Sequence, residues 1–266
     1  SVVESETSIR PFDYVSVLRL GRQLGWIRAD GVREPHPHIL SALGARYWIL
    51  PAGTRPPRAA SETPDAQVIA PSLRRIYCNH DENWALWENP DSLPRVWFVR
   101  HWHRLKPLEN PSWKEVQQRT EEVFFPDGNP RNLLQEAVIE SAHTPTFSQL
   151  TGNTVLPTED RHVILRDEPQ WIDVQVSLQK PAMLVMRDYF DTDWKATIHT
   201  AGVTYQNTWP ILRTNRIMRG IWLPAGTHRV TLRYQPLSFY VGGTISLIAW
   251  LILSGFVIYR MLRLAR

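Results

Sequence analysis

WIDVQVSL, residues 171–178, alternates apolar and polar side chains from Ile172 to Leu178. The same alternation returns at residues 228–234, HRVTLRY. Successive side chains of a strand point to opposite faces of a sheet, so this pattern buries one face and leaves the other in water. The two stretches therefore predict strands of an antiparallel sheet.

Strand-like runs continue around these two stretches. They are short, rich in β-branched and aromatic residues, and separated by Pro, Asn and Asp. The runs are residues 74–78, 85–89, 95–100, 137–141, 182–190, 194–200 and 217–223. A more polar insert near residues 111–136 interrupts them and contains a candidate helix at 112–123. Residues 73–236 are therefore predicted to form a β-sandwich region.

The first part of the chain differs in character. The expected elements are a helix at residues 11–25, a short helix at 37–43 and a strand at 46–50. Residues 1–60 are therefore predicted to be a small α/β module, and the proline-rich residues 61–72 a surface linker. The fold class predicted for the chain is α+β, mainly β: a small helix–strand module, an antiparallel β-sandwich and one C-terminal transmembrane helix.

The transmembrane prediction rests on a strongly apolar run near the C-terminus. Residues 239–259 read FYVGGTISLIAWLILSGFVIY and carry no charged side chain. As a helix, this run would be about 31 Å long, close to the thickness of the hydrocarbon core of a bilayer. Tyr240 and Tyr259 lie near its ends, where amphipathic rings favour the headgroup region. The alternative is a buried core helix, which rarely runs this far without a charge.

Basic residues predict the orientation of this span. Arg260, Arg263 and Arg266 follow it directly, and positive residues close to a span tend to remain in the cytoplasm. Arg229 and Arg233 precede the span, but they belong to a strand pattern. We expect a cell-membrane protein with an extracytoplasmic bulk and a basic cytoplasmic tail at residues 260–266.

This orientation requires the bulk of the chain to be exported. Residues 1–25 contain no basic segment followed by an apolar core, which is the pattern of a signal peptide, and the first residue is Ser1 rather than Met. We therefore expect the chain to be the C-terminal part of a larger polytopic protein. Its expected partners are the lipid bilayer and the transmembrane helices upstream.

Composition narrows the function further. The formal net charge is +4, and three of the positive charges are the arginines of the last seven residues. A nucleic-acid binder needs a larger basic cluster, so no nucleic-acid partner is expected. The single cysteine, Cys78, excludes an internal disulfide and any CxxC metal or redox motif. The sequence contains no GxSxG, P-loop or GxGxxG motif, and we expect no cofactor.

Four residues of the sandwich region are candidates for ligand binding. Asp188 ends an apolar run, with Tyr189 beside it, and its carboxylate could accept a proton or bind a sugar hydroxyl. Alternatively, Asp188 pairs with an arginine such as Arg219 and fixes a hairpin. Trp194 could stack on the apolar face of a sugar, although aromatic side chains of a sandwich more often belong to the core.

Metal binding has two weaker candidate patterns. His101 and His103 would lie on one face of a strand, as a zinc pair does, but zinc needs at least a third ligand, such as Asp188 in a hydrolase-like site. Asp191-Thr-Asp193 has the DxD form that holds a metal and a nucleotide sugar in some glycosyltransferases. Asp and Thr are also ordinary turn residues, and we expect no bound metal at either place.

Four segments of the chain resemble, in order, segments of the YfhO-like bacterial membrane proteins. Together they extend over residues 35–260. They are PHPHIL with LGARY at 35–47, WENP with LPRVWFV at 87–99, LVMRDYF with WKA at 184–196, and a segment from Asn215 through RGIWLPAGTHR to YQP at 215–236. The sequence departs from the family where Thr192-Asp193 replaces a Pro-Gly pair before Trp194.

The resemblance implies a multi-span protein of the bacterial cell envelope, similar to the GT-C class of glycosyltransferases, which use lipid-linked sugars. The catalytic carboxylate of such proteins lies in an early external loop, and nothing in this chain matches that region. The resemblance thus implies that this chain is a non-catalytic C-terminal part, with a glycan or a lipid-linked sugar as a partner. The alternative is a membrane-tethered carbohydrate-binding or assembly module without enzymatic activity.

Overall fold

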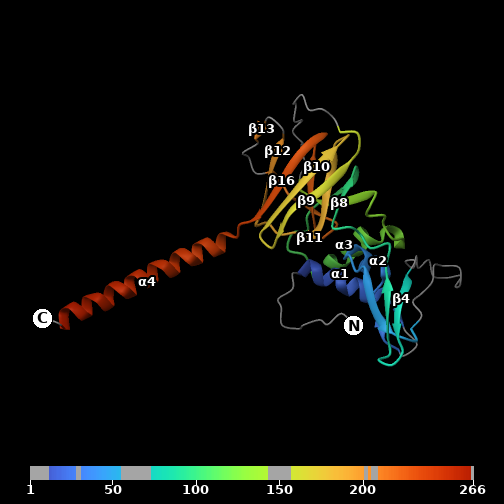
Figure 1. Cartoon of the computed structure of the whole chain (residues 1–266), viewed down its shortest axis with the longest axis horizontal. Coiled ribbons are helices and arrows are strands. Elements are labelled where there is room, and N and C mark those ends of the chain that lie inside the picture. The colour runs from blue at the N-terminus through green and yellow to red at the C-terminus, as the bar shows by residue number, and fades with distance from the viewer. Residues whose placement is uncertain are drawn as a thin grey trace.

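The computed structural model describes residues 12–27, 31–54, 73–142, 157–200, 203–204 and 209–264. These residues form a mainly β structure with helices on one side of it and one long helix that points away (Figure 1). The helices are α1 (Phe12–Gln23), α2 (Pro37–Ala42), α3 (Trp113–Phe124) and α4 (Leu237–Leu264), with one 3-10 turn, η1, at Pro126–Gly128.

Two sheets make the predicted sandwich. The five-stranded sheet contains, in spatial order, β13 (Val203–Thr204), β12 (Trp194–Thr200), β16 (Gly226–Tyr234), β10 (Trp171–Leu178) and β9 (Arg161–Glu168). The six-stranded sheet contains β6 (Val96–Val99), β11 (Ala182–Tyr189), β15 (Met218–Leu223), β14 (Leu212–Thr214), β8 (Glu136–Glu140) and β7 (His101–Leu105). All pairs are antiparallel except β7 with β8, which is parallel.

A smaller sheet lies apart from the sandwich. It consists of β3 (Tyr47–Pro51), β5 (Trp84–Glu88) and β4 (Arg74–Asn79), and the short strands β1 (Trp26–Ile27) and β2 (Arg33–Glu34) form a separate pair. The three-stranded sheet joins chain segments that precede and follow the predicted linker, residues 61–72. The linker itself lies outside the described residues.

The six-stranded sheet is buried on both faces, which makes it the middle layer. Along β11, Leu184 and Met186 face the five-stranded sheet, whereas Met183 and Val185 face the helices. A strand covered on both sides reads as a continuous apolar run rather than an alternating one, as residues 182–186 do. In the outer sheet, β16 keeps one face that is more exposed and therefore alternates. The polar face of β10 is exposed at Gln175, whereas Asp173 and Ser177 are covered there.

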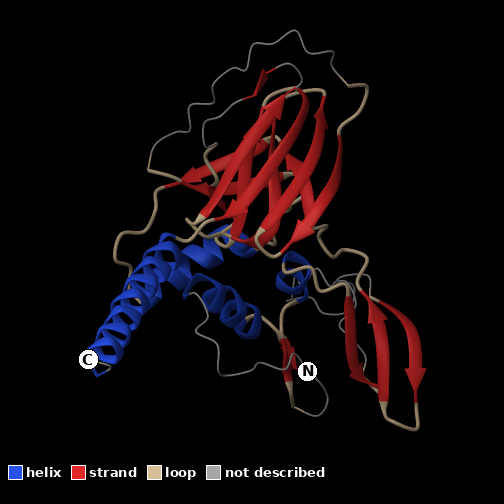
Figure 2. Cartoon of the chain, turned by 60° about the vertical axis from the view of Figure 1, so that its left-hand side comes forward, coloured by secondary structure: helices blue, strands red, loops and turns tan. Residues whose placement is uncertain are grey.

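Helices α1, α2 and α3 supply the apolar side chains of the second core, and Figure 2 shows them gathered below the strands. The predicted helix at residues 112–123 is α3. It begins at a capping box, in which the Ser112 hydroxyl accepts from the Glu115 backbone N–H and the Glu115 carboxylate accepts from that of Ser112. Its buried face, which includes Val116 and Val123, packs towards α1 and the sheet.

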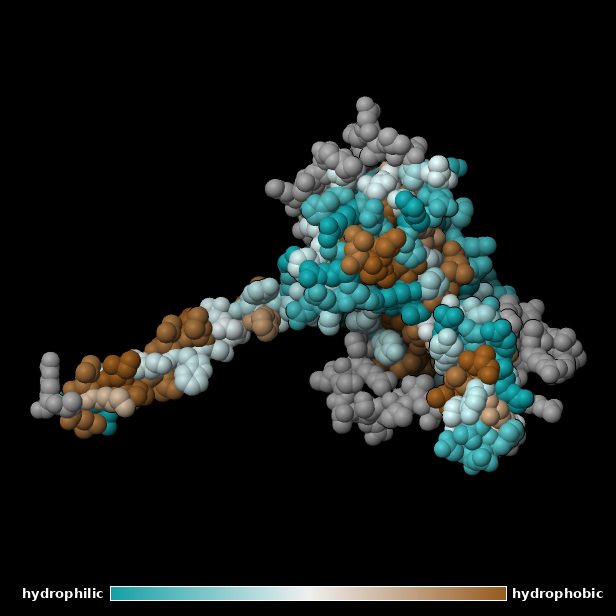
Figure 3. Space-filling model, in the orientation of Figure 1, coloured by the Kyte–Doolittle hydropathy of each residue, from teal (hydrophilic) through white to brown (hydrophobic). Residues whose placement is uncertain are grey.

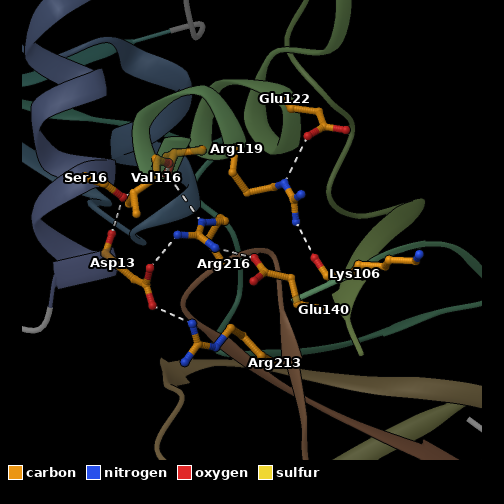
Figure 4. A network of polar contacts seen from close by, with 10 residues as sticks. Asp13, Ser16, Lys106, Val116, Arg119, Glu122, Glu140, Arg213 and Arg216 are labelled. Atoms are coloured by element: carbon orange, nitrogen blue, oxygen red, sulfur yellow. Dashed lines mark hydrogen bonds and ion pairs between the residues drawn. The ribbon is translucent and has the colours of Figure 1, made fainter. Parts of the chain in front are cut away.

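A buried ion network joins the helices to the six-stranded sheet (Figure 4). The Arg216 side chain is only 1% exposed, and its guanidinium pairs with the Asp13 carboxylate on α1 and, at 2.5 Å, with the Glu140 carboxylate on β8. Its Nε lies 3.4 Å from the Thr120 hydroxyl on α3. Asp13 also accepts from Arg213 at 2.6 Å. One arginine thus bridges three elements that are distant in sequence.

Helix α4 is, in the described part of the chain, the helix long and apolar enough to cross a membrane. It spans 28 residues, none of them buried, and includes the whole predicted span at 239–259. Figure 3 shows its apolar surface extending away from the rest of the molecule. The helix follows β16 after only two residues, Gln235 and Pro236.

The Arg216 network predicts a large stability difference between two arginine substitutions. Arg216→Met leaves two carboxylates without their buried partner and should lower the free energy of unfolding by about 3–5 kcal/mol. Arg74→Met removes an exposed partner of Glu88 and should leave the free energy of unfolding nearly unchanged, because solvent screens that pair. Denaturant unfolding of the full chain in detergent micelles, followed by tryptophan fluorescence, measures both. Equal losses would contradict the bridging role of Arg216.

The histidines before and within α2 predict a pH dependence of stability. Burial lowers the pKa of His36 from 6.5 to about 4, and burial together with a smaller Coulomb interaction with His36 lowers that of His38 to about 4. The folded state therefore binds fewer protons than the unfolded state. The stability that this provides is complete above about pH 6.5 and is lost as the pH falls towards 4.

His36→Asn keeps a side-chain acceptor for the His38 backbone N–H, which His36 Nδ1 accepts at 3.1 Å, but it removes one titrating group. The unfolding temperature of this variant should fall less than that of the parent between about pH 7 and pH 5. Burial also lowers the pKa of His162 and His228, so part of the dependence should remain. His80→Asn, at an exposed turn position, is the matched control substitution.

Candidate functional site

The four ligand-binding candidates named from the sequence line one cleft. Asp188, Tyr189, Trp194 and Arg219 surround a space of about 390 Å³ at the end of the sandwich from which α4 departs. We call this end the α4 end. The remaining lining residues are Arg95, Asp167, Glu168, Pro169 and Ile172.

Both sheets contribute to the cleft at their α4 end. From the five-stranded sheet, Glu168 ends β9 and Trp194 begins β12. From the six-stranded sheet, β11 contributes Asp188, and the adjacent strand β15 contributes Arg219. The pairing of β11 with β15 shifts register between Met186 and Tyr189, which is a β-bulge. Bulges re-aim side chains, and this one lies at the position of Asp188.

Asp188 is held by an arginine, but not by the one expected from the sequence. Arg95 donates from Nε and Nη2 to the two oxygens of Asp188, at 3.1 and 3.2 Å, and its Nη1 pairs with Asp167. The prediction that an arginine such as Arg219 pairs with Asp188 is therefore corrected to Arg95. Arg95 immediately precedes β6, and β6 lies next to β11, the strand that carries Asp188. The adjacency of these two strands explains why Arg95 pairs with Asp188.

Arg219 is buried without the partners that a buried charge normally has. The residue is 5% exposed, and only its Nε has a hydrogen-bond acceptor among the described residues, the Tyr189 carbonyl at 2.8 Å. Nη1 is shielded from solvent and has no acceptor. The guanidinium lies 3.9 Å from the centre of the Trp194 ring. Burial lowers the pKa of Arg219 to about 10, against the opposing attraction of Asp188.

Trp194 is less available to a sugar than the sequence suggested. One face of its ring is covered by the Arg219 guanidinium, and the Tyr234 ring lies 5.4 Å away at a tilt. The residue is only 9% exposed. Trp194 therefore belongs to the wall of the cleft, and the structure does not present its ring as an open stacking platform.

The metal candidates are not brought together. His101 and His103 lie on β7, at the edge of the six-stranded sheet, whereas Asp188 lies on β11 with β15, β14 and β8 between. His103 Nε2 lies 2.7 Å from the Glu136 carboxylate. Within the described ranges, no group of three His, Cys, Asp or Glu side chains could hold a metal ion. The proposed His101, His103 and Asp188 ligand set is therefore wrong.

The Asp191-Thr192-Asp193 sequence forms a turn. The Asp193 backbone N–H donates to the Asp191 carboxylate at 2.7 Å, and the Thr192 carbonyl accepts from Lys195 at 3.0 Å. These contacts are those of an ordinary Asx turn between β11 and β12.

Sequence reasoning missed three charged residues of the cleft, Arg95, Asp167 and Glu168. Arg95 lies in the LPR motif at residues 93–95, which is part of a segment quoted for the family resemblance. That motif could have identified Arg95 as a candidate. Asp167 belongs to β9, a strand that the sequence analysis did not predict. In β9, exposed side chains alternate with partly buried ones, but the exposed ones include the apolar Val163 and Leu165. The sequence of this strand therefore does not alternate between apolar and polar residues.

Three of the segments quoted for the YfhO-like resemblance meet beside the cleft. Asn89 donates to the Ser41 hydroxyl at 2.9 Å and to the Ala45 carbonyl at 3.2 Å. Arg187, from the third segment, donates to the Leu93 carbonyl and packs so close to Gly44 that a Cβ there would overlap its guanidinium. Residues of these motifs thus contact one another, so the motifs have a structural role in this fold.

Comparisons of the chain with known protein families, with curated proteins and with solved structures find no match in any of the three.

Proposed function

We propose that this chain is the C-terminal extracytoplasmic domain and last membrane span of a YfhO-like polytopic protein of the bacterial cell envelope. In this proposal the parent is a glycosyltransferase that uses a lipid-linked sugar, and its catalytic part lies outside the chain. The domain itself is non-catalytic. It holds a glycan or the sugar of a lipid-linked substrate beside the membrane.

The observation that carries this proposal is the position of the cleft relative to α4. Tyr234, the last residue of β16, donates its backbone N–H to the Gln170 carbonyl at 3.0 Å. The next residue, Gln235, donates its backbone N–H to the Asp193 carbonyl at 2.9 Å, and α4 begins at Leu237. These contacts tie the start of the helix to the walls of the cleft. If α4 spans the bilayer, a ligand in the cleft lies close to the membrane surface, where a lipid-linked sugar presents its head.

The pairing of the carboxylates favours binding over catalysis in this chain. Asp188 and Asp167 are both paired with Arg95, and these contacts hold the two carboxylates in place at the wall of the cleft. A few polar groups held in fixed positions are what a binding site needs. This observation equally favours the alternative function, a membrane-tethered carbohydrate-binding module in a parent without enzymatic activity. Replacing the acidic residues in the first external loop of the parent separates the two, because only a glycosyltransferase would lose activity.

The proposed orientation predicts which side of the membrane each end of α4 faces. In a Cys78→Ser background, Lys180→Cys places a thiol on an exposed turn of the sandwich, and Leu264→Cys places one at the exposed end of α4. A membrane-impermeant maleimide added to intact cells with a permeable outer envelope should label the first variant. It should label the second only after the cytoplasmic membrane is opened.

The Cys78→Ser parent, without any thiol, measures background labelling. Labelling of the two variants in the reverse pattern would overturn the extracytoplasmic placement. Labelling of both variants from outside would overturn the membrane-spanning role of α4.

A further inference from the structure

Arg219 occupies a place where a structural side chain would be apolar. Its neighbours on the sandwich-facing side of β15 and β11, such as Ile221 and Leu184, form the core between the two sheets. A guanidinium carries five N–H donors. Here Nε donates to the Tyr189 carbonyl, whereas the buried Nη1 group has no hydrogen-bond acceptor in the described part of the chain. Leaving buried donors of a charged group unsatisfied is destabilising. An acceptor supplied by a ligand would offset that loss.

The charges around Arg219 restrict what the ligand can be. The cleft is lined by two arginines and three carboxylates, those of Asp167, Glu168 and Asp188. Arg95 is already shared between Asp167 and Asp188. A phosphate or carboxylate ligand would bring further negative charge against these groups, which costs free energy in a partly buried site. A neutral acceptor avoids this repulsion.

A hydroxyl group meets both requirements of the cleft. Its oxygen accepts a hydrogen bond, and its own O–H donates one. Asp188 accepts two hydrogen bonds from Arg95, and its oxygens have further lone pairs that can accept from a ligand. Pro169 and Ile172, together with the edge of Trp194, add apolar surface to the same cleft. Apolar walls with a few convergent polar groups are the general composition of small-molecule sites.

We infer that this cleft binds a neutral sugar ring, with the Arg219 guanidinium donating to a hydroxyl oxygen and the Asp188 carboxylate accepting from a hydroxyl of the same ring. Pro169 and Ile172 contact the C–H face of the ring. The inference deepens the proposed function and rests on it for the source of the sugar, the head of a lipid-linked substrate or a glycan. The binding chemistry itself does not depend on the orientation of α4.

The test uses the full chain in nanodiscs of neutral phospholipid. The probes are the methyl pyranosides of glucose, galactose, mannose and N-acetylglucosamine, and the charged comparisons are glucose 1-phosphate, glucuronate and inorganic phosphate. Binding is measured by titration, followed by ligand NMR. At least one neutral pyranoside should bind with a Kd of about 1 mM or somewhat weaker, the range for a single small ring with few contacts.

Two variants and one control assign that binding to the cleft. Arg219→Met removes the free donors at similar volume, and Asp188→Asn removes the charge but keeps the shape. Each should weaken the affinity for the neutral sugar at least about tenfold. Arg100→Met is the control. Arg100 pairs with Asp160 at the other end of the sandwich, so its replacement should leave the affinity unchanged.

Stability separates a binding arginine from a structural one. Because Arg219 is buried with unsatisfied donors, Arg219→Met should leave the unfolding temperature unchanged or raise it. A marked fall in that temperature, together with unchanged sugar affinity, would show a structural role and overturn the inference. Tighter binding of the charged probes than of the neutral ones would overturn the ligand class. Absence of binding by every probe at about a hundred times the expected Kd would overturn the site.

These outcomes remain distinct from those of the labelling experiment. Neutral-sugar binding together with reversed thiol labelling would leave the cleft assignment standing and remove the extracytoplasmic placement. Labelling in the expected pattern without sugar binding would leave the extracytoplasmic placement standing and remove the cleft assignment.

Discussion

The buried charge of Arg216 fixes how the layers of this molecule stack. A guanidinium that is shielded from water must be matched by carboxylates, because removal of either partner leaves an uncompensated charge in the interior. Its matches come from α1 and β8, and α3 adds a hydroxyl. The helices are therefore positioned against the six-stranded sheet by a directional contact as well as by apolar packing. That packing buries the second face of β11 and β15, the strands that place Asp188 and Arg219.

The turn that carries Arg216 supports this reading. Residues 215–217 connect β14 to β15, and Asn215 and Arg216 both have positive φ, at 46° and 69°. Gly adopts positive φ without a steric cost, whereas a long side chain rarely does. Arginine in that conformation is strained, and such strain persists where the surroundings determine it strongly. Here the surroundings are the ion pairs of its own side chain. Arg219, three residues later, is buried in the same hairpin but lacks carboxylate partners.

Much of the sheet architecture was readable from the sequence because the information is local. Period-two alternation in β10 and β16 reports a one-sided environment, and the charge-free run at 239–259 reports α4. What covers the second face of β11 was not readable, since an apolar run does not identify its neighbour. Asp188, Tyr189, Trp194 and Arg219 were chosen by residue type. Their convergence on one cleft, and the pairing of Asp188 with Arg95, depend on strand order in space, which no local pattern records.

The short connection between β16 and α4 has a mechanical consequence. Only Gln235 and Pro236 separate the strand from the helix, and proline restricts the backbone there. β16 is the central strand of its sheet and is flanked by β12 and β10. A change in the angle of α4 would therefore act directly on β16. Tyr234, at the end of this strand, pairs with Trp194 in the wall of the cleft, so such a change would reach that wall first.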